Sequence, residues 1–205
     1  MSHDLSIDYW NNRYLNNDFS WDAGAVTTPL KDYVDQITDK SISILIPGAG
    51  NAYEAEYLVN NGFTNVFVCD FAEAPLNNLQ KRCPLIKPKN LLQIDFFKIE
   101  DLKFDLIIEQ TFFCALDPSL RKKYFEKVAS LLNDSGKLVG LLFNDPLNSD
   151  KPPFGGNKNE YYNYFKDYFH VKKYETCHNS IKPRAGRELF INLVKKEKVK
   201  KLTVN

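Results

Sequence analysis

The chain has 205 residues, enough to bury a sizeable hydrophobic core, and a single domain is the natural expectation. Its 27 lysines and arginines nearly cancel its 26 aspartates and glutamates, which argues against a protein that coats nucleic acid. Without a bilayer-length apolar run, a signal-peptide core or clustered cysteines, we expect a cytoplasmic monomer with reduced thiols, no membrane contact and no bound metal.

The first 40 residues predict a helical segment that precedes the sheet. Apolar and aromatic residues have helical spacing over residues 6–17, and a Thr-Thr-Pro-Leu sequence opens a second helix over residues 27–37. The chain's two tryptophans, Trp10 and Trp21, both fall in this segment. Two interpretations stay open: the rings anchor the segment on the domain, or they form a lid over a ligand.

Residues 42–70 predict the unit around which the rest of the chain is arranged. A short β-branched apolar run over residues 42–46, typical of a buried parallel strand, ends at a loop that contains Gly48 and Gly50. A helix and a second strand follow, and the second strand ends at Asp70. The order is therefore strand, glycine loop, helix, strand and acid.

The helix of this unit is predicted from its capping residues. Asn51 is placed to cap the first turn, with Glu54 in the capping-box position three residues later. The Asn-Asn-Gly sequence at residues 60–62 is a typical helix end.

The same unit fits a nucleoside cofactor. Glycines allow the backbone to approach a ligand, and an acid roughly 20 residues after the loop can accept hydrogen bonds from ribose hydroxyls. Tyr53 occupies the place of a third glycine, which disfavours NAD and a dehydrogenase. S-adenosylmethionine, whose only anionic group is one carboxylate, fits better; a tight turn with an incidental surface aspartate is the alternative.

The rest of the chain alternates strands and helices. This pattern predicts an α/β fold with a doubly wound, seven-stranded, mostly parallel sheet, Rossmann-like, with an N-terminal helical lid. One domain over residues 1–205 would divide into a lid segment (1–40), a core (41–195) and a basic tail (196–205). The expected later elements are a helix at 73–81, strands at 91–94 and 104–108, a helix at 119–132, a strand at 137–143, a long loop at 144–159, a helix at 160–167 and an antiparallel pair at 169–176 and 188–194.

Polar residues gather at one predicted edge of the sheet. Asp70, Asp95, Glu109 and Asp145 all follow the carboxyl ends of predicted strands, beside the glycine loop. Ligands of doubly wound sheets bind at that edge. We therefore expect a binding site there.

These features together resemble a class I S-adenosylmethionine-dependent methyltransferase. More narrowly, they are similar to the thiopurine methyltransferase superfamily, and to its thiol and halide/thiocyanate methyltransferase branch because of the Phe-Phe-Cys-Ala run at 112–115. The motifs that carry the resemblance are Tyr9-Trp10, Trp21-Asp22, Gly24, Thr28-Pro29-Leu30, Ile46-Pro47-Gly48-Ala49-Gly50 and the stretch FDLIIEQTFFCALDP at 104–118.

The resemblance implies a role for particular positions. Those implied to bind S-adenosylmethionine are Trp10, Tyr14 and Trp21 in the lid, Gly48 and Gly50 under the methionine portion, Asp70 at the ribose, Asp95 and Phe96 at the adenine, and Glu109 beside the sulfonium. Gln110 departs from the Arg or Tyr that often follows, which leaves the substrate undetermined.

Methyl transfer from a sulfonium is an in-line displacement, and an anionic acceptor loses its charge as it reacts. A water-poor pocket should favour that step. Because a thiol is partly ionised at neutral pH, a dedicated base can be unnecessary. The candidates for the acceptor pocket are Phe112, Phe113, Phe154, Tyr161 and Arg187, and each aromatic ring could equally be core packing.

Three other features have two interpretations each. His178 could be a base or an ordinary exposed histidine. Lys182, Arg184 and Arg187 could attract an anionic substrate or lie in a solvated loop. Cys114 has no basic neighbour in sequence, so a small buried side chain is favoured over a nucleophile.

We therefore expect transfer of a methyl group to a small soft nucleophile, a thiol or sulfide, with halide, thiocyanate or thiopurine as alternatives. A nucleic-acid or protein methyltransferase is disfavoured, because the N/D-P-P-Y/F motif is replaced by Glu-Gln-Thr-Phe at 109–112. A non-catalytic module that only binds a nucleoside cofactor stays open.

Overall fold

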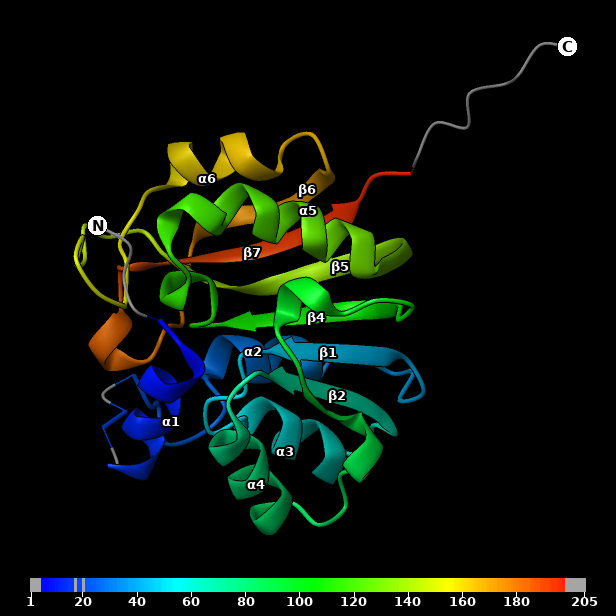
Figure 1. The fold of residues 1–205 in the computed structure, drawn as a ribbon. Coiled ribbons are helices and arrows are strands. Elements are labelled where there is room, and N and C mark those ends of the chain that lie inside the picture. Colours follow the sequence, from blue (N-terminus) through cyan, green and yellow to red (C-terminus); the bar gives the residue numbers. More distant parts are fainter. Residues whose placement is uncertain (1–4, 17, 20, 198–205) are drawn as a thin grey trace, which may run out of the picture.

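The structure, a computed structural model, describes residues 5–16, 18–19 and 21–197. A seven-stranded sheet in the order β3-β2-β1-β4-β5-β7-β6 forms its centre (Figure 1). The strands are β1 (Ser43–Pro47), β2 (Asn65–Asp70), β3 (Leu91–Gln93), β4 (Phe104–Gln110), β5 (Leu132–Phe143), β6 (Phe169–Thr176) and β7 (Glu188–Lys195).

The predicted doubly wound topology is confirmed. Strands β1 to β5 pair in parallel, and β7 inserts between β5 and β6 with antiparallel pairing on both sides. The chain goes outward from β1 to β3 and then returns to place β4 on the other side of β1. The carboxyl ends of β1 and β4 therefore flank the point where the strand order reverses, which is where such sheets bind ligands.

Helices and short 3₁₀ turns connect the strands. The helices are α1 (Ile7–Leu15), α2 (Thr28–Val34), α3 (Tyr53–Asn60), α4 (Glu73–Arg82), α5 (Arg121–Leu131) and α6 (Lys158–Phe165). The 3₁₀ turns are η1 (Pro88–Asn90), η2 (Phe96–Lys98), η3 (Phe113–Ala115), η4 (Pro118–Leu120) and η5 (Lys182–Arg184). Within the described residues, none of these helices combines the length and apolar character that a membrane crossing requires.

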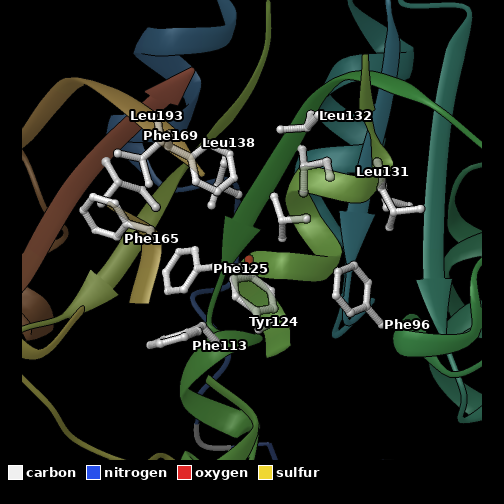
Figure 2. Close-up of a cluster of buried hydrophobic side chains, with 14 of the residues drawn as sticks. Phe96, Phe113, Tyr124, Phe125, Leu131, Leu132, Leu138, Phe165, Phe169 and Leu193 are labelled. Carbon is white, nitrogen blue, oxygen red and sulfur yellow. The ribbon is translucent and has the colours of Figure 1, made fainter. Parts of the chain in front are cut away.

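Two hydrophobic cores cover the two faces of the sheet. Ile44 and Ile46 of β1 belong to the core under α2, α3 and α4, whereas Leu45 belongs to the core under α5 and α6. This division follows from the alternation of side chains along a strand. The core under α5 and α6 is rich in aromatic rings, and Figure 2 shows Tyr124 and Phe125 of α5 beside Phe113.

The predicted capping of α3 is wrong. The helix begins after Ala52, which has a left-handed φ of 48°, and no side chain caps it. Gly50 is also left-handed, and Asn51 lies before the N-cap position instead of occupying it. Its Nδ2 instead donates to Asp22 Oδ2 at 2.8 Å, and this bond ties the glycine loop to the N-terminal segment.

Other differences concern element boundaries. The strand predicted at 104–108 continues to Gln110, and the strand predicted from residue 137 begins at Leu132. Phe104 pairs with Leu132 and Leu106 with Lys137, with a register shift between them. A pattern of apolar residues cannot show that shift, because the intervening residues are polar and Ser135 has a φ of 60°.

Candidate active site

A cavity of about 500 Å³ opens at the carboxyl ends of the parallel strands. Four parts of the chain line it: helix α1 with Trp21, the glycine loop, the ends of β2 and β3, and the segment from Gln110 to Leu120. Pro152 and Pro153 of the long loop close another side. Figure 1 shows α1 beyond the ends of these strands. Most of the lining is apolar, and its charged residues are Arg13, Asp70, Asp95 and Asp117.

The structure brings together residues that are far apart in the sequence. Of the nine positions predicted to bind a cofactor, those that line this cavity are Trp10, Tyr14, Trp21, Gly48, Gly50, Asp70, Asp95 and Phe96. Contact with a cofactor stays a prediction for each of them. Their convergence on one cavity follows from the fold, since each comes from the N-terminal segment or from the end of a parallel strand.

Asp70 connects the glycine loop to helix α4. Its Oδ2 accepts from the backbone N–H of Ala49 at 2.9 Å, and its Oδ1 accepts from that of Ala72 at 2.8 Å. Burial raises the pKa of Asp70 to about 6, while the backbone donors oppose the rise. The carboxylate is therefore ionised at neutral pH and has lone pairs left for a ligand in the cavity.

Gly48 lies against the ring of Phe112. Its φ is +69°, and a Cβ at this position would be 2.4 Å from Cδ2 of Phe112, far inside van der Waals contact. A glycine is therefore required both by the backbone conformation and by the ring. At Gly50, with a φ of +51°, a Cβ would have its nearest neighbours at 4.0 Å, so only the conformation restricts that position.

The N-terminal aromatic residues form a cluster over the glycine loop. Trp21 makes edge-to-face contacts with Trp10 and Tyr14, at ring-centroid distances of 5.7 and 5.9 Å, and the Arg13 guanidinium lies 4.6 Å from its ring centroid. The Nε1 of Trp21 and the hydroxyl of Tyr14 both approach Gly50. The rings thus anchor the segment and line the cavity at once, while opening and closing as a lid stays a prediction.

Glu109 does not line the cavity, in contrast to the position beside a cofactor that the resemblance implied. It is fully buried, and its Oε1 accepts from the backbone N–H groups of Phe112 and Phe113 at 2.8 and 2.9 Å. Its Oε2 accepts from the Tyr124 hydroxyl at 2.6 Å. Burial raises the pKa of Glu109 to about 7, against the effect of these three donors. The side chain holds the loop after β4 from the inside.

Three of the aromatic residues predicted for the acceptor pocket belong to the hydrophobic interior instead. Phe112 lines the cavity, but Phe113, Phe154 and Tyr161 are each 1% exposed and lie off it. The tight turn that begins at Phe112 sends successive side chains to opposite sides, one to the cavity and one to the core. The rings of Phe113 and Tyr161 lie 5.3 and 5.4 Å from the buried Arg121 guanidinium.

The basic residues near the C-terminus also lie off the cavity. Arg187 is exposed and pairs with Asp145, so it does not line the predicted acceptor pocket. Arg184 is buried, donates to the carbonyl of Trp21 at 2.7 Å and pairs with Glu188 at 3.4 Å. His178 is exposed and outside the lining as well. Arg184 therefore anchors the N-terminal segment, which the sequence did not indicate.

The structure adds residues that sequence analysis did not assign. Arg13, Gln110 and Thr111 line the cavity, and Thr111 has a φ of 61°, which is unusual for a β-branched residue. In the sequence Gln110 stood out as a departure from the Arg or Tyr that often follows the acid, but it had no assigned role. Cys114 touches the cavity, but its thiol donates to the carbonyl of Thr111 at 3.2 Å, and burial raises its pKa to about 12.

This arrangement suits binding and shielding more than acid–base chemistry. The cavity lining combines the carboxylates of Asp70, Asp95 and Asp117 with a larger apolar area. No histidine lines it among the residues that the structure describes. Within the same part of the chain, no cluster of three or more histidine, cysteine or acidic side chains is arranged to hold a metal ion.

Comparison with protein families decides the assignment. Residues 5–204 match the family described as thiopurine S-methyltransferase. The chain belongs to the thiopurine S-methyltransferase family. The resemblance inferred from the glycine loop, the tryptophan segment and the Phe-Phe-Cys-Ala run is thereby confirmed.

Relatives of known name agree with this family. The chain is 30% identical over 145 residues to a probable thiol methyltransferase 2 of Arabidopsis thaliana, a match that covers 69% of this chain and 64% of the relative. It is 24% identical over 137 residues to thiocyanate methyltransferase 1 of the same plant, covering 65% and 60% of the two chains. The matches thus span less than two thirds of either relative.

Two solved structures with similar folds are named as methyltransferases. The 1,6-didemethyltoxoflavin N1-methyltransferase of Burkholderia thailandensis superposes with a TM-score of 0.74 at 15% identity, covering 93% of this chain and 87% of that one. The magnesium protoporphyrin IX methyltransferase of Synechocystis gives 0.71 at 13% identity, covering 96% and 100%. At these identities the likeness concerns the fold.

Proposed function

We propose that this chain transfers a methyl group from S-adenosylmethionine to a small soft nucleophile, by preference a thiol or sulfide. The observation that carries the proposal is the convergence of the glycine loop, Asp70, Asp95 and the tryptophan cluster on one cavity. Family membership supports the reaction type, and the names of the thiol and thiocyanate methyltransferase relatives support the class of acceptor.

The cavity has the shape and chemistry to hold the cofactor. Its volume of about 500 Å³ lies within the range typical of small-molecule sites. Gly48 and Gly50 leave space over the backbone, and the Asp70 carboxylate can accept both ribose hydroxyls. The indole N–H of Trp21 and the Tyr14 hydroxyl, which converge on Gly50, suit a carboxylate. The cofactor would supply an electrophilic methyl group on a sulfonium.

The apolar part of the lining is suited to the acceptor. Its apolar residues, contributed by the loop after β4, η4 and the long loop, include Phe112, Leu116, Leu120, Pro152 and Pro153. When a thiolate attacks a sulfonium, two opposite charges disappear in the transition state. An apolar wall therefore favours the step, because it solvates the separated ions poorly.

Among the described residues that line the cavity there is no histidine, and two groups that could be taken for bases are protonated at neutral pH. The Cys114 thiol, with its pKa raised to about 12, stays protonated, and burial together with the Asp70 charge raises the pKa of the Tyr14 hydroxyl well above its usual value. Acceptors that are already anionic, such as thiolates, sulfide, thiocyanate and halides, need no base from the protein, whereas a neutral alcohol would need one.

Two measurements test the proposal. Calorimetry should show S-adenosylhomocysteine binding with NAD binding much more weakly, and tighter binding of NAD would refute the cofactor assignment. A panel of sulfide, small thiols, thiocyanate, iodide and a thiopurine should then show turnover with the sulfur acceptors highest. Cofactor binding without turnover of any acceptor would instead favour a non-catalytic binding module.

A further inference from the structure

A buried arginine holds one of the cavity's tryptophans from outside the cavity. Arg184 lies in η5, between β6 and β7, and does not line the cavity. Its Nη2 donates to the backbone carbonyl of Trp21 at 2.7 Å, and Trp21 does line the cavity. The two residues are 163 positions apart in the sequence, so this bond connects the C-terminal part of the fold to the N-terminal segment.

The guanidinium of Arg184 is fixed to the sheet. Its Nη1 pairs with Oε1 of Glu188, the first residue of β7, at 3.4 Å. Its central carbon lies 5.7 Å from the ring centroid of Phe143, at the end of β5. The side chains of Arg184 and Glu188 are 9% and 2% exposed. Because desolvation of two buried charges offsets their attraction, such an ion pair adds little net stability. Its geometry therefore has to be explained in another way.

The bond acts on the peptide unit that joins Trp21 to Asp22. Arg184 binds the carbonyl oxygen of this unit, and the N–H group of the unit, which belongs to Asp22, donates to the carbonyl of Phe19 at 2.9 Å. Because a peptide unit is planar, two hydrogen bonds at opposite edges fix its orientation. The Cα of Trp21 lies in the same plane, so the direction in which the indole leaves the backbone is restricted too.

Asp22 ties the same place to the glycine loop and to α3. Its Oδ2 accepts from Asn51 Nδ2 at 2.8 Å and from the Tyr53 hydroxyl at 3.1 Å. The Nε1 of Trp21 lies 4.0 Å from the place that a Cβ on Gly50 would take. Trp21 is thus held between two parts of the fold, with Asp22 attached to the glycine loop and its own carbonyl attached to η5.

We propose that Arg184 is a positioning residue for cofactor binding, because its bond to the Trp21 carbonyl holds the indole against the glycine loop and thereby sets the affinity for the cofactor. This inference rests on the proposed function, in which the indole N–H meets the cofactor's carboxylate. Without the bond, the segment stays attached through Asp22 while the ring gains freedom. Binding must then order the ring again, and that cost weakens the affinity.

The first experiment compares Arg184→Met with the wild type. Methionine keeps an unbranched apolar chain beside Phe143 but has no donor for Trp21. We expect the Kd for S-adenosylhomocysteine and the KM for S-adenosylmethionine to rise about fivefold or more. The kcat at saturating cofactor should change by less than about twofold, because Arg184 does not line the cavity. A general loss of folded enzyme would lower kcat as well.

Two further variants guard against misfolding. Arg184→Met leaves the buried Glu188 carboxylate without its cation, so the double variant Arg184→Met/Glu188→Gln removes both charges and should show the same rise in Kd. Arg184→Lys keeps the charge beside Glu188 but lacks the forked guanidinium that also reaches Trp21. It should weaken binding by an intermediate amount. An unchanged Kd in both methionine variants would overturn the proposal.

Two controls lie on the same connection between β6 and β7. Arg187→Met changes an exposed arginine that pairs with Asp145 outside the cavity. Asn179→Ala removes the bond of 2.8 Å from Asn179 Nδ2 to Asp32 Oδ2, a second tie to the N-terminal segment that does not involve Trp21. Both should leave the Kd for S-adenosylhomocysteine within about twofold of the wild type. An equal loss of affinity in Asn179→Ala would refute the specific role of the Trp21 bond.

The fluorescence of Trp21 separates this inference from the proposed function. The chain has two tryptophans, so Trp10→Phe leaves Trp21 as the only one. In that background and without ligand, Arg184→Met should shift the emission to longer wavelength and increase its quenching by acrylamide, whereas Arg187→Met should not. Unchanged emission, or a shift with an unchanged Kd, would overturn the proposal even if the enzyme methylates thiols. Failure of the wild type to methylate any acceptor would count against the proposed function alone, since neither measurement needs turnover.

Discussion

The two sides of the cavity are held in place by different means. On the side assigned to the cofactor, the carboxylate of Asp70 accepts hydrogen bonds from the backbone N–H groups of Ala49 and Ala72. On the side assigned to the acceptor, the loop after β4 is held from beneath by Glu109, which is fully buried and bonded to Tyr124 of α5. The cofactor side thus depends on hydrogen bonds between backbone and side chains that lie near the surface of the cavity, whereas the acceptor side depends on a carboxylate buried in the core.

This difference bears on how acceptor preference can change. A substitution in the glycine loop acts directly on the cofactor site. A substitution in the core under α5 can move Phe112 without touching a ligand, because Phe112 is connected to that core through the backbone bonds of Glu109. The predictions below test whether the two sides respond independently.

The largest expected effect concerns Glu109→Ala. This change removes the acceptor for the amides of Phe112 and Phe113 and for the Tyr124 hydroxyl, all in a buried place. We expect a loss of about 3–5 kcal/mol in the free energy of unfolding, measured by urea denaturation. A loss below about 1 kcal/mol would show that the acceptor side does not depend on this carboxylate.

Glu109→Gln tests the charge of the same side chain. In the folded protein its pKa is raised to about 7, above the ordinary value of 4.5, so the folded state binds the proton more tightly than the unfolded chain. The resulting stabilisation is fully present below pH 4.5 and is lost as the pH rises through 7. We expect the wild type to lose roughly 2–3 kcal/mol more than Glu109→Gln between these pH values. Parallel stability profiles would contradict this assignment.

Gly48→Ala tests the contact between the two sides. The new Cβ would be 2.4 Å from Phe112, and the φ of +69° is unfavourable for alanine. We expect about 2–4 kcal/mol of destabilisation together with loss of cofactor binding. Gly50→Ala is the control, because its φ of +51° carries the conformational cost while its Cβ meets nothing closer than 4.0 Å. If the two substitutions destabilise the protein equally, the ring of Phe112 can move aside at no measurable cost in free energy.

Asp70→Ala tests the cofactor side alone. Loss of the bonds to the ribose should weaken S-adenosylhomocysteine binding by about 1.5–3 kcal/mol, as measured by calorimetry. Because burial raises the pKa of Asp70 to about 6, wild-type affinity should fall as the pH drops below 6 and the carboxylate gains a proton. Asp70→Asn should lack this pH dependence. An unchanged Kd in Asp70→Ala would place the ribose elsewhere.

The smallest effect is expected for Arg187→Ala. Arg187 is exposed and its ion pair with Asp145 lies off the cavity. We expect less than about 0.5 kcal/mol of change in stability and less than a twofold change in kcat/KM. A large drop in kcat/KM that disappears at high salt would restore the earlier hypothesis that this loop attracts an anionic substrate.

The amino-acid sequence alone determined the sheet and the position of the site. Short apolar runs separated by helical patterns predict a doubly wound topology, since parallel strands need crossover helices, and that topology places the ends of β1, β2 and β4 at one edge. The residue types that follow each strand were therefore enough to indicate the glycine loop and Asp70. Local periodicity carries this information because it reflects contacts within a few residues.

Only the tertiary structure decided which side chains face the cavity and which lie beneath it. Phe112 and Phe113 are chemically alike and adjacent, yet one lines the cavity and the other packs against Tyr124. Glu109 and Gln110 divide in the same way: the acid is buried under the loop, and Gln110 is among the residues that line the cavity. These choices depend on the left-handed turn at Thr111 and on partners such as Thr27 and Tyr124. Those partners are distant along the chain, so no local pattern can reveal them.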